Sequence, residues 1–183
     1  MKKRIAVIDT ETTYYDDVMS IGIVIADSTN LTADMSLYYV FPEECWKPAM
    51  YSNVLYYNDQ RTIKKFRGEA MEEIIEHFEK ENVAEIFAYN ALFDKGHLPE
   101  LSSYVWKDIM KLAAYRQYNP CIPEDAPCYK TGRLKSGYGV ESIMRMLSGA
   151  RNYSEVHNAL CDAEDELKIM QLLKLDIDRY PEI

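Results

Sequence analysis

The stretch from Ile5 to Thr13 constrains this chain more than any other. Four apolar residues, Ile5 to Ile8, come directly before Asp9 and Glu11, which predicts a short buried strand with an acidic carboxyl end. Side chains alternate along a strand, so Asp9 and Glu11 project from the same face. Two such carboxylates repel each other unless a cation neutralises them, and a divalent metal ion is the simplest cation to do so. The alternative is that both are solvated residues leaving a strand.

Length and composition limit the fold and the location. The chain has 183 residues, which suits one well-cored domain over 1–183, with a core from about 4 to 175 and a short C-terminal tail. No stretch has the roughly 20 apolar residues that span a bilayer. The basic start is followed by too few apolar residues for a secretory signal. We therefore expect a cytoplasmic protein with no membrane partner.

The net charge of −9 argues at first sight against a nucleic-acid partner. Divalent ions held by carboxylates would offset part of that charge, so local charge matters more than the total. Basic residues gather from Arg61 to Arg67, where they either face a phosphate backbone or form a solvated surface. A second group, Lys130, Arg133 and Lys135, lies in a predicted loop, and its role stays open. The four cysteines form no C-x-x-C pair, which favours reduced thiols over a zinc site.

The rest of the chain alternates strand and helix patterns. Apolar runs predict strands at 18–26, 37–41, 85–89 and 105–106, and helical periodicity predicts helices at 68–81, 109–116, 140–147 and 159–173. The opening strands predict an antiparallel meander, and the later helices change the class to α/β. Asn90 is placed to cap a helix that starts at Ala91 and carries Asp94 in its first turn. Prolines and glycines in residues 117–139 predict a long loop, either functional or mobile.

The last predicted helix carries a carboxylate on its apolar face. At about 100° per residue, Ala159 and Leu173 share one face, and Asp162 lies within about 20° of Leu173. Buried acids are rare unless they are paired or bound to metal. His157 can approach the same site only from a loop before the helix, because a continuous helix would turn it away.

Three segments of the chain carry acidic residues in a recognisable order: Asp9-Thr10-Glu11-Thr12, Tyr89-Asn90-Ala91-Leu92-Phe93-Asp94 and His157-Asn158-Ala159-Leu160-Cys161-Asp162-Ala163. They resemble the three exonuclease motifs of the DEDDh, or DnaQ-like, family. Their order and spacing match from about Arg4 to Leu173. The resemblance implies a ribonuclease H-like α/β fold, with a mixed five-stranded sheet and helices on both faces. It also implies a 3′-to-5′ exonuclease that removes nucleoside 5′-monophosphates from single-stranded or frayed 3′ ends of DNA or RNA.

Carried over by position, the resemblance implies a site for two Mg²⁺ or Mn²⁺ ions. Asp9 would bridge both ions, Glu11 and Asp162 would complete the shell of the first, and Asp94 would hold the second. His157 would be the general base that takes a proton from the attacking water. Oxygen ligands suit these hard cations, and an imidazole can take a proton near neutral pH.

The resemblance also implies contacts to the substrate and to other proteins. Thr12 and Thr13 would line the pocket for the terminal nucleotide, and Asn90 either contacts that nucleotide or only caps its helix. Tyr14 stands where the family often has glycine, and Tyr89 where it commonly has histidine, which bears on specificity rather than on the metal ligands. The protein is then either a free-standing trimming enzyme or a proofreading subunit beside a DNA polymerase. Many members of the family form homodimers.

Two other interpretations stay open. Asp9 and Glu11 faintly resemble the D-x-D-x-T opening of haloacid-dehalogenase phosphatases, with Asp162 and Asp165 as their last acidic motif. That family normally has aspartate as the second acid, and it leaves His157 without a role. The other interpretation is a non-catalytic ribonuclease H-like scaffold that binds nucleic acid or a polymerase.

Overall fold

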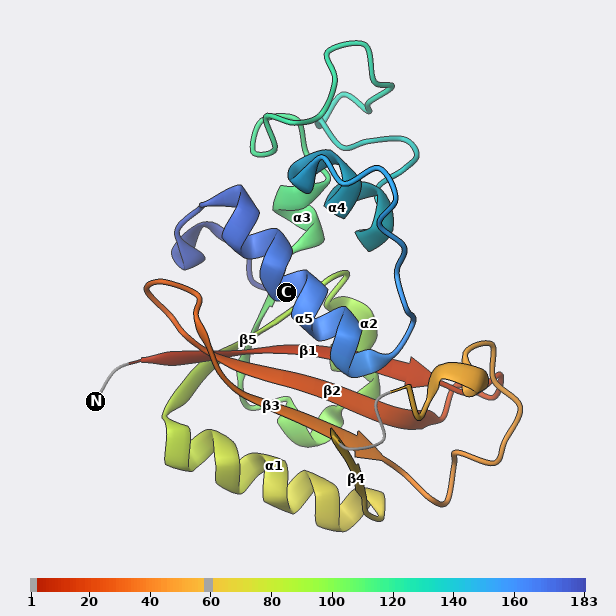
Figure 1. Ribbon diagram of the computed structural model, residues 1–183. Coiled ribbons are helices and arrows are strands. Elements are labelled where there is room, and N and C mark those ends of the chain that lie inside the picture. Colours follow the sequence, from red (N-terminus) through yellow and green to blue (C-terminus); the bar gives the residue numbers. More distant parts are fainter. Residues whose placement is uncertain (1–2, 58–60) are drawn as a thin grey trace.

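The computed structural model describes residues 3–57 and 61–183. Its centre is a six-stranded sheet with the strand order β4-β3-β2-β1-β5-β6, covered by helices on both faces (Figure 1). The strands are β1 (Arg4–Thr12), β2 (Val18–Asp27), β3 (Ala33–Val40), β4 (Thr62–Lys64), β5 (Val83–Ala88) and β6 (Val105–Asp108). The helices are α1 (Arg67–Glu81), α2 (Leu92–His97), α3 (Met110–Ala113), α4 (Val140–Ser148) and α5 (Ala159–Leu173), with single 3₁₀ turns at Ser52–Val54, Pro99–Leu101 and Ile177–Arg179.

The sheet is mixed, as the resemblance implies. β1, β2 and β3 form the expected antiparallel meander, while β5 runs parallel to β1 and β6 runs parallel to β5. All five expected strands are present. A sixth, β4, has only three residues and pairs in parallel with β3 at the sheet edge. It lies in a stretch whose sequence pattern predicts irregular structure, because so short an edge strand has no periodicity of its own.

Two apolar layers hold the helices against the sheet. Ile5 and Val7 pack on the side of α3, α4 and α5, whereas Ala6 and Ile8 pack on the side of α1. All four side chains are fully buried, and burying a large aliphatic side chain stabilises a fold by about 1.5–3 kcal/mol. Figure 1 shows α5 lying across one face of the sheet and α1 along the other. The alternation places Asp9 and Glu11, next in this series, on the face that α5 covers.

The region between α3 and α4 differs from its prediction. The helix expected over 109–116 is only the single turn α3. The following residues form an ordered loop rather than a loose one, with isolated bridges that pair Tyr115 with Arg133 and Cys128 with Leu134. Helices α1, α4 and α5 begin and end within one residue of their predicted limits, and α2 begins one residue after its predicted start. In the described part of the chain, every helix is too short or too polar to cross a membrane.

Candidate metal and catalytic site

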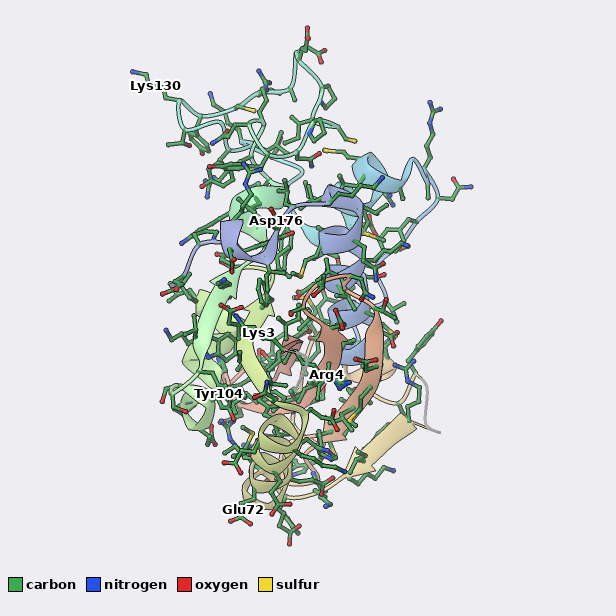
Figure 2. All side chains as sticks on the ribbon, turned by 90° about the vertical axis from the view of Figure 1, so that its left-hand side faces the viewer. Lys3, Arg4, Glu72, Tyr104, Lys130 and Asp176 are labelled. Atoms are coloured by element: carbon green, nitrogen blue, oxygen red, sulfur yellow. The ribbon has the colours of Figure 1, made fainter. Side chains whose placement is uncertain are left out.

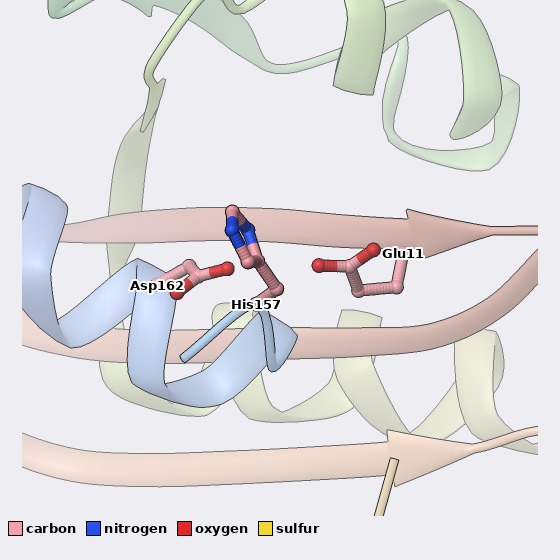
Figure 3. A group of neighbouring side chains, drawn as sticks. All are labelled: Glu11, His157 and Asp162. Carbon is pink, nitrogen blue, oxygen red and sulfur yellow. The ribbon is translucent and has the colours of Figure 1, made fainter. Parts of the chain in front are cut away.

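Two carboxylates and an imidazole from three segments of the chain meet at one end of the sheet. Glu11 comes from β1, Asp162 from the first turn of α5, and His157 from the loop directly before α5. One ligand atom from each of these residues lies within 4.8 Å of the other two. Figure 3 shows the three side chains pointing toward one another. The sequence therefore predicted correctly that His157 reaches Asp162 from a loop and not from the helix.

Asp9 lies in the middle of the acidic group. Burial raises its pKa well above the ordinary value, and the charges of Asp94, Glu166, Asp162 and Glu11 raise it further. Among the described residues, its Oδ2 atom is buried and has no hydrogen-bond partner. A buried carboxylate oxygen without a donor is costly, so this atom is ready to bind a cation.

Glu11 and Asp162 share this environment. Burial, followed by the charge of Glu155, raises the pKa of each carboxyl to about 8. The Oδ1 atom of Asp162 is also buried and lacks a hydrogen-bond partner among the described residues. Without a cation, these groups therefore keep protons at neutral pH.

Asp94 comes from α2, the helix that follows β5, and β5 is the neighbour of β1 on the edge opposite β2. Its Oδ1 atom accepts hydrogen bonds from the backbone nitrogen of Thr10 at 3.1 Å and from the Thr10 hydroxyl at 2.8 Å. Burial raises the pKa of Asp94 to about 7, although the bonds from Thr10 lower it. Thr10 thus fixes one carboxylate oxygen of Asp94.

Asn90 does not cap α2, so that alternative for its role is wrong. Its backbone has a positive φ of 64°, and Ala91 takes the N-cap position without any side-chain capping bond. The Asn90 carbonyl, rather than its side chain, accepts a hydrogen bond of 2.9 Å from the backbone of Phe93. Its exposed side chain is left available for other contacts.

His157 is held in place by a tyrosine that the sequence did not single out. The ring of Tyr51 stacks on the imidazole, with ring centroids 4.0 Å apart and an angle of 13° between the planes. His157 itself has a positive φ of 59°, which is unusual for a residue with a side chain. No local sequence signal identifies Tyr51, because it is one of 15 tyrosines and lies more than a hundred positions away.

Asn158 fixes the start of α5. Its side-chain oxygen accepts a hydrogen bond from the backbone nitrogen of Cys161 at 3.4 Å, as an N-cap residue does. Its side-chain nitrogen donates to the Tyr38 hydroxyl at 2.9 Å and to the Val54 carbonyl at 3.1 Å. Asparagine directly before an apolar helix is a known capping signal that could have identified this role.

Glu166 is a further carboxylate at the site that the sequence analysis missed. It lies one turn after Asp162 on α5 and is only 1% exposed. Its Oε2 atom accepts a hydrogen bond of 3.0 Å from the backbone nitrogen of Tyr89. Burial and the charge of Asp94 raise its pKa well above the ordinary value. The spacing of four residues from Asp162 was the available signal, because it places both on one helix face.

The two threonines expected to contact substrate differ in their surroundings. Thr12 is half-buried at the end of β1. Thr13 is 5% exposed, and its hydroxyl accepts hydrogen bonds from the backbone nitrogens of Tyr15 at 3.1 Å and Asp17 at 3.3 Å. The Thr13 hydroxyl is therefore engaged in the turn between β1 and β2.

The residues present fit a divalent cation. Five carboxylates with raised pKa values lie together here, with Asp94, Asp162 and Glu166 buried and Asp9 and Glu11 half-buried. Two of their buried oxygens have no hydrogen-bond partner in the described part of the chain. Carboxylate oxygens are the ligands that Mg²⁺ and Mn²⁺ prefer. A bound cation would remove the repulsion that raises these pKa values.

Comparison with known proteins shows the fold but no close relative. No protein-family model matches the chain, and no curated protein matches it by sequence. Among solved structures, the nuclease domain of 3′hExo, a DEDDh family member bound to rAMP, aligns with a TM-score of 0.68 at 13% identity, covering 100% of this chain and 96% of that one. A 3′-exonuclease in a structure of histone mRNA stem-loop recognition aligns with a TM-score of 0.65 at 12% identity, covering 100% of this chain and 71% of that one.

A larger nuclease shows the same similarity over part of its length. The zinc-bound complex of E. coli ExoI with single-stranded DNA aligns with a TM-score of 0.65 at 13% identity, covering 98% of this chain. This chain spans 42% of that ExoI chain. The alignments confirm the ribonuclease H-like fold. This chain has the fold of the nuclease domains of DEDDh 3′-exonucleases.

Proposed function

We propose that the protein is a metal-dependent 3′-to-5′ exonuclease that removes nucleoside 5′-monophosphates by phosphodiester hydrolysis. One observation carries the proposal. Asp9, Glu11, Asp94 and Asp162 meet His157 at one end of the sheet, and two buried carboxylate oxygens there have no hydrogen-bond partner among the described residues. This set of ligands, with an imidazole beside it, suits hydrolysis assisted by divalent metal ions.

The carboxylates would hold two Mg²⁺ or Mn²⁺ ions. Asp9 is the proposed bridging ligand, because its carboxylate interacts with all the other acids of the site. Glu11 and Asp162 would bind one ion, and Asp94 the other. The bound ions would activate the attacking water and stabilise the leaving 3′ oxygen.

His157 is the proposed general base. Its imidazole lies among the ligand atoms of Glu11 and Asp162, and histidine is the side chain that most often serves as a general base. Stacking on Tyr51 orients the ring. The hydrogen bonds from Thr10 likewise fix the orientation of the Asp94 carboxylate.

The proposed substrate is a nucleic acid with a free 3′ end, single-stranded or frayed. The solved structures with this fold support that class, since E. coli ExoI was solved with single-stranded DNA and a 3′-exonuclease with a histone mRNA stem-loop. Thr12, Thr13 and Asn90 are the proposed contacts to the terminal nucleotide. Thr13 would act through the turn that it stabilises, because its hydroxyl is already engaged.

The phosphatase alternative has less support. It needs Asp165 as a catalytic acid, but the Asp165 carboxylate accepts a hydrogen bond from the Tyr153 hydroxyl. The scaffold alternative requires that the metal site bind ions without hydrolysing a substrate.

The test uses purified protein and 5′-labelled single-stranded DNA and RNA with either a free 3′ hydroxyl or a blocked 3′ end, in Mg²⁺, Mn²⁺ or EDTA. The proposal predicts a metal-dependent ladder that shortens one nucleotide at a time from a free 3′ end. Hydrolysis of p-nitrophenyl phosphate with intact oligonucleotides would favour the phosphatase. Metal binding with neither activity would favour the scaffold.

A further inference from the structure

Aromatic and basic side chains gather on the ordered loop between α3 and α4. Tyr129 is 48% exposed and Tyr138 is 38% exposed. The Arg133 guanidinium lies over both rings, with its Cζ atom 5.0 Å from the centroid of Tyr129 and 5.4 Å from that of Tyr138. The Lys135 ammonium lies 5.7 Å from the Tyr129 centroid. We call these four residues the basic hairpin.

The basic hairpin has a defined backbone. The backbone nitrogen of Tyr129 donates to the Arg133 carbonyl at 2.8 Å, and that of Leu134 donates to the Ala114 carbonyl at 2.9 Å. The Arg116 guanidinium braces the loop by donating to the Ala126 carbonyl at 2.6 Å. A ligand that binds here would not have to order the backbone first, which lowers the cost of binding.

The positive charges of the basic hairpin are not neutralised within the chain. In residues 3–57 and 61–183, neither Arg133 nor Lys135 forms an ion pair with a carboxylate. The other basic group of the sequence behaves differently, because three of its four residues form ion pairs: Arg61 with Glu164, Lys65 with Glu73, and Arg67 with Glu100. In a chain with a net charge of −9, the basic hairpin is thus available to an anionic partner.

The basic hairpin is linked to the carboxylate site by two hydrogen bonds. The hydroxyl of Tyr89 donates to the carbonyl of Tyr138, and the backbone nitrogen of Tyr89 donates to Glu166 at 3.0 Å. Tyr89 directly follows β5, the strand beside β1. Tyr138 is therefore the end of the basic hairpin nearest the site, and the loop extends outward from it.

We infer that the basic hairpin binds single-stranded nucleic acid on the 5′ side of the terminal nucleotide. This inference rests on the proposed function, which places the 3′ end at the carboxylates. Bases stack on exposed tyrosine rings, and arginine and lysine contact the phosphates, a combination typical of proteins that bind single strands without sequence preference. The basic hairpin would thus make affinity depend on strand length.

A matched control lies at the other end of the molecule. Figure 2 shows Lys130, on the loop of the basic hairpin, at the opposite end from Glu72 on α1. Lys80 is exposed near the end of α1. The substitution Lys80→Ala removes the same charge as Lys135→Ala but leaves the basic hairpin intact.

The test is fluorescence anisotropy with 5′-labelled oligothymidylates of roughly 3 and roughly 15 nucleotides, which lie below and within the usual range of single-strand site sizes. Ca²⁺ replaces Mg²⁺ to prevent hydrolysis. The double variant Arg133→Ala/Lys135→Ala should bind the longer strand about tenfold more weakly and the shorter strand as the wild type does. The slope of log affinity against log salt should fall by about 1.4, since each lost phosphate contact contributes roughly 0.7 for single strands. The single variant Lys135→Ala, which removes one charge as Lys80→Ala does, should lower this slope by about 0.7, whereas Lys80→Ala should leave the affinity for both strands unchanged.

A second pair of variants separates stacking from folding. Tyr129→Ala should lower the affinity for the longer strand. Tyr129→Phe keeps the aromatic ring and should bind the longer strand as the wild type does. The inference is overturned if the wild type binds the two oligonucleotides with equal affinity, or if the double variant has the same affinities as Lys80→Ala. It is also overturned if the double variant loses affinity for the short and the long oligonucleotide to the same extent. Hydrolysis of the short strand in Mg²⁺ tests the proposed function separately. If that hydrolysis is absent while the length effect remains, the proposed function fails and the binding site stands.

Discussion

Gly22 on β2 lies so close to the start of α5 that a Cβ atom on Gly22 would stand 2.1 Å from the carbonyl carbon and oxygen of Ala159. Gly22 is also the residue of β2 that pairs with Asp9 of β1. The absence of a side chain at Gly22 therefore lets the first turn of α5 rest on the sheet beside Asp9. This contact brings Asp162 to the carboxylates of β1.

The first prediction concerns this contact. Gly22→Ala should force α5 away from the sheet, because the atoms in the way belong to the backbone and cannot rotate aside. Overpacking of this kind costs about 1–3 kcal/mol, which lowers the melting temperature by roughly 2–12 °C in a chain of this size. Nuclease activity should fall by more than the fraction of unfolded protein accounts for, because Asp162 moves with α5 away from the other carboxylates.

Gly68→Ala is the matched control for Gly22→Ala. Gly68 lies in α1, and nothing stands within 4 Å of a Cβ atom placed there. This variant should melt at the wild-type temperature or slightly above it, because alanine favours a helix more than glycine does. If Gly22→Ala behaves like Gly68→Ala in both thermal melting and activity, the close packing of α5 is not required.

The second prediction concerns pH and metal. Folding raises the pKa of Glu11 and Asp162 to about 8 from ordinary values of 4.5 and 3.8, so the folded metal-free protein holds more protons than the unfolded chain between those values. The contribution of these two carboxyls to the free energy of unfolding should therefore be largest at acidic pH and should fall as the pH rises toward about 8. Mg²⁺ should reverse this loss, because it replaces the protons as the neutralising charge.

Melting curves at about pH 6 and about pH 8.5, with EDTA or Mg²⁺, test whether the stability of the metal-free protein falls as the pH rises. At a metal concentration about 100 times its dissociation constant, stability should rise by about 2.7 kcal/mol, or roughly 5–10 °C. When the same metal concentration is used at both pH values, the increase should be larger at the higher pH, because fewer protons compete with the metal for the carboxylates. An equal or larger increase at the lower pH would contradict the account.

The third prediction separates metal binding from turnover. His157→Ala should leave Mn²⁺ affinity within a few-fold of the wild type, since the carboxylates remain, and should lower kcat by roughly 10²–10⁴-fold, as loss of a general base does. Metal titration and steady-state kinetics on the same sample measure both effects. His77→Ala, on α1 and away from the carboxylates, is the control and should retain wild-type kcat. If His157→Ala loses metal affinity in step with kcat, His157 is a metal ligand and not the base.

The fourth prediction concerns Glu166. Glu166→Gln keeps an acceptor for the backbone nitrogen of Tyr89 but removes one negative charge from the buried group. Metal affinity should fall roughly tenfold or more, a typical effect for a group behind the ligands. The metal-free melting temperature at about pH 8 should rise, because repulsion with Asp94 and Asp162 is relieved.

The two opposite changes expected for Glu166→Gln distinguish an electrostatic role from a purely structural one. A structural role predicts a lower melting temperature with or without metal. Glu72→Gln, an exposed change of the same kind on α1, should alter neither quantity. Unchanged metal affinity in Glu166→Gln would place Glu166 outside the metal site.

Asp9, Glu11 and Asp162 were predictable from the sequence because their signals are local, whereas Glu166 was not predicted. An apolar run with period two fixes the faces of Ile5 and Val7, and Asp9 follows on the same face. The start of α5 at Ala159 agrees with the predicted limit, since a capping asparagine and an apolar face mark it. The resemblance to the exonuclease motifs predicted that these three segments come together in one site.

Other features depend on contacts between distant parts of the chain and could not be read locally. Gly22 matters only because it pairs with Asp9 and lies under α5. The two basic groups of the sequence look alike, yet one is neutralised by acids such as Glu164 from a distant helix. The side chain of Asn90 follows the usual capping pattern, but the positive φ of its backbone moves the cap to Ala91.

The most direct test of the central claim compares two aspartates on one helix. Asp162 lies among the proposed metal ligands, whereas Asp165, one turn further along α5, accepts a hydrogen bond from Tyr153. The measurement is the rate at which wild type, Asp162→Asn and Asp165→Asn shorten a 5′-labelled single strand in Mg²⁺. We predict a loss of about a hundredfold or more for Asp162→Asn, because metal assistance contributes several kcal/mol, and at most a few-fold loss for Asp165→Asn. Equal activity of Asp162→Asn and wild type, or a wild type that leaves the strand intact, would contradict the account.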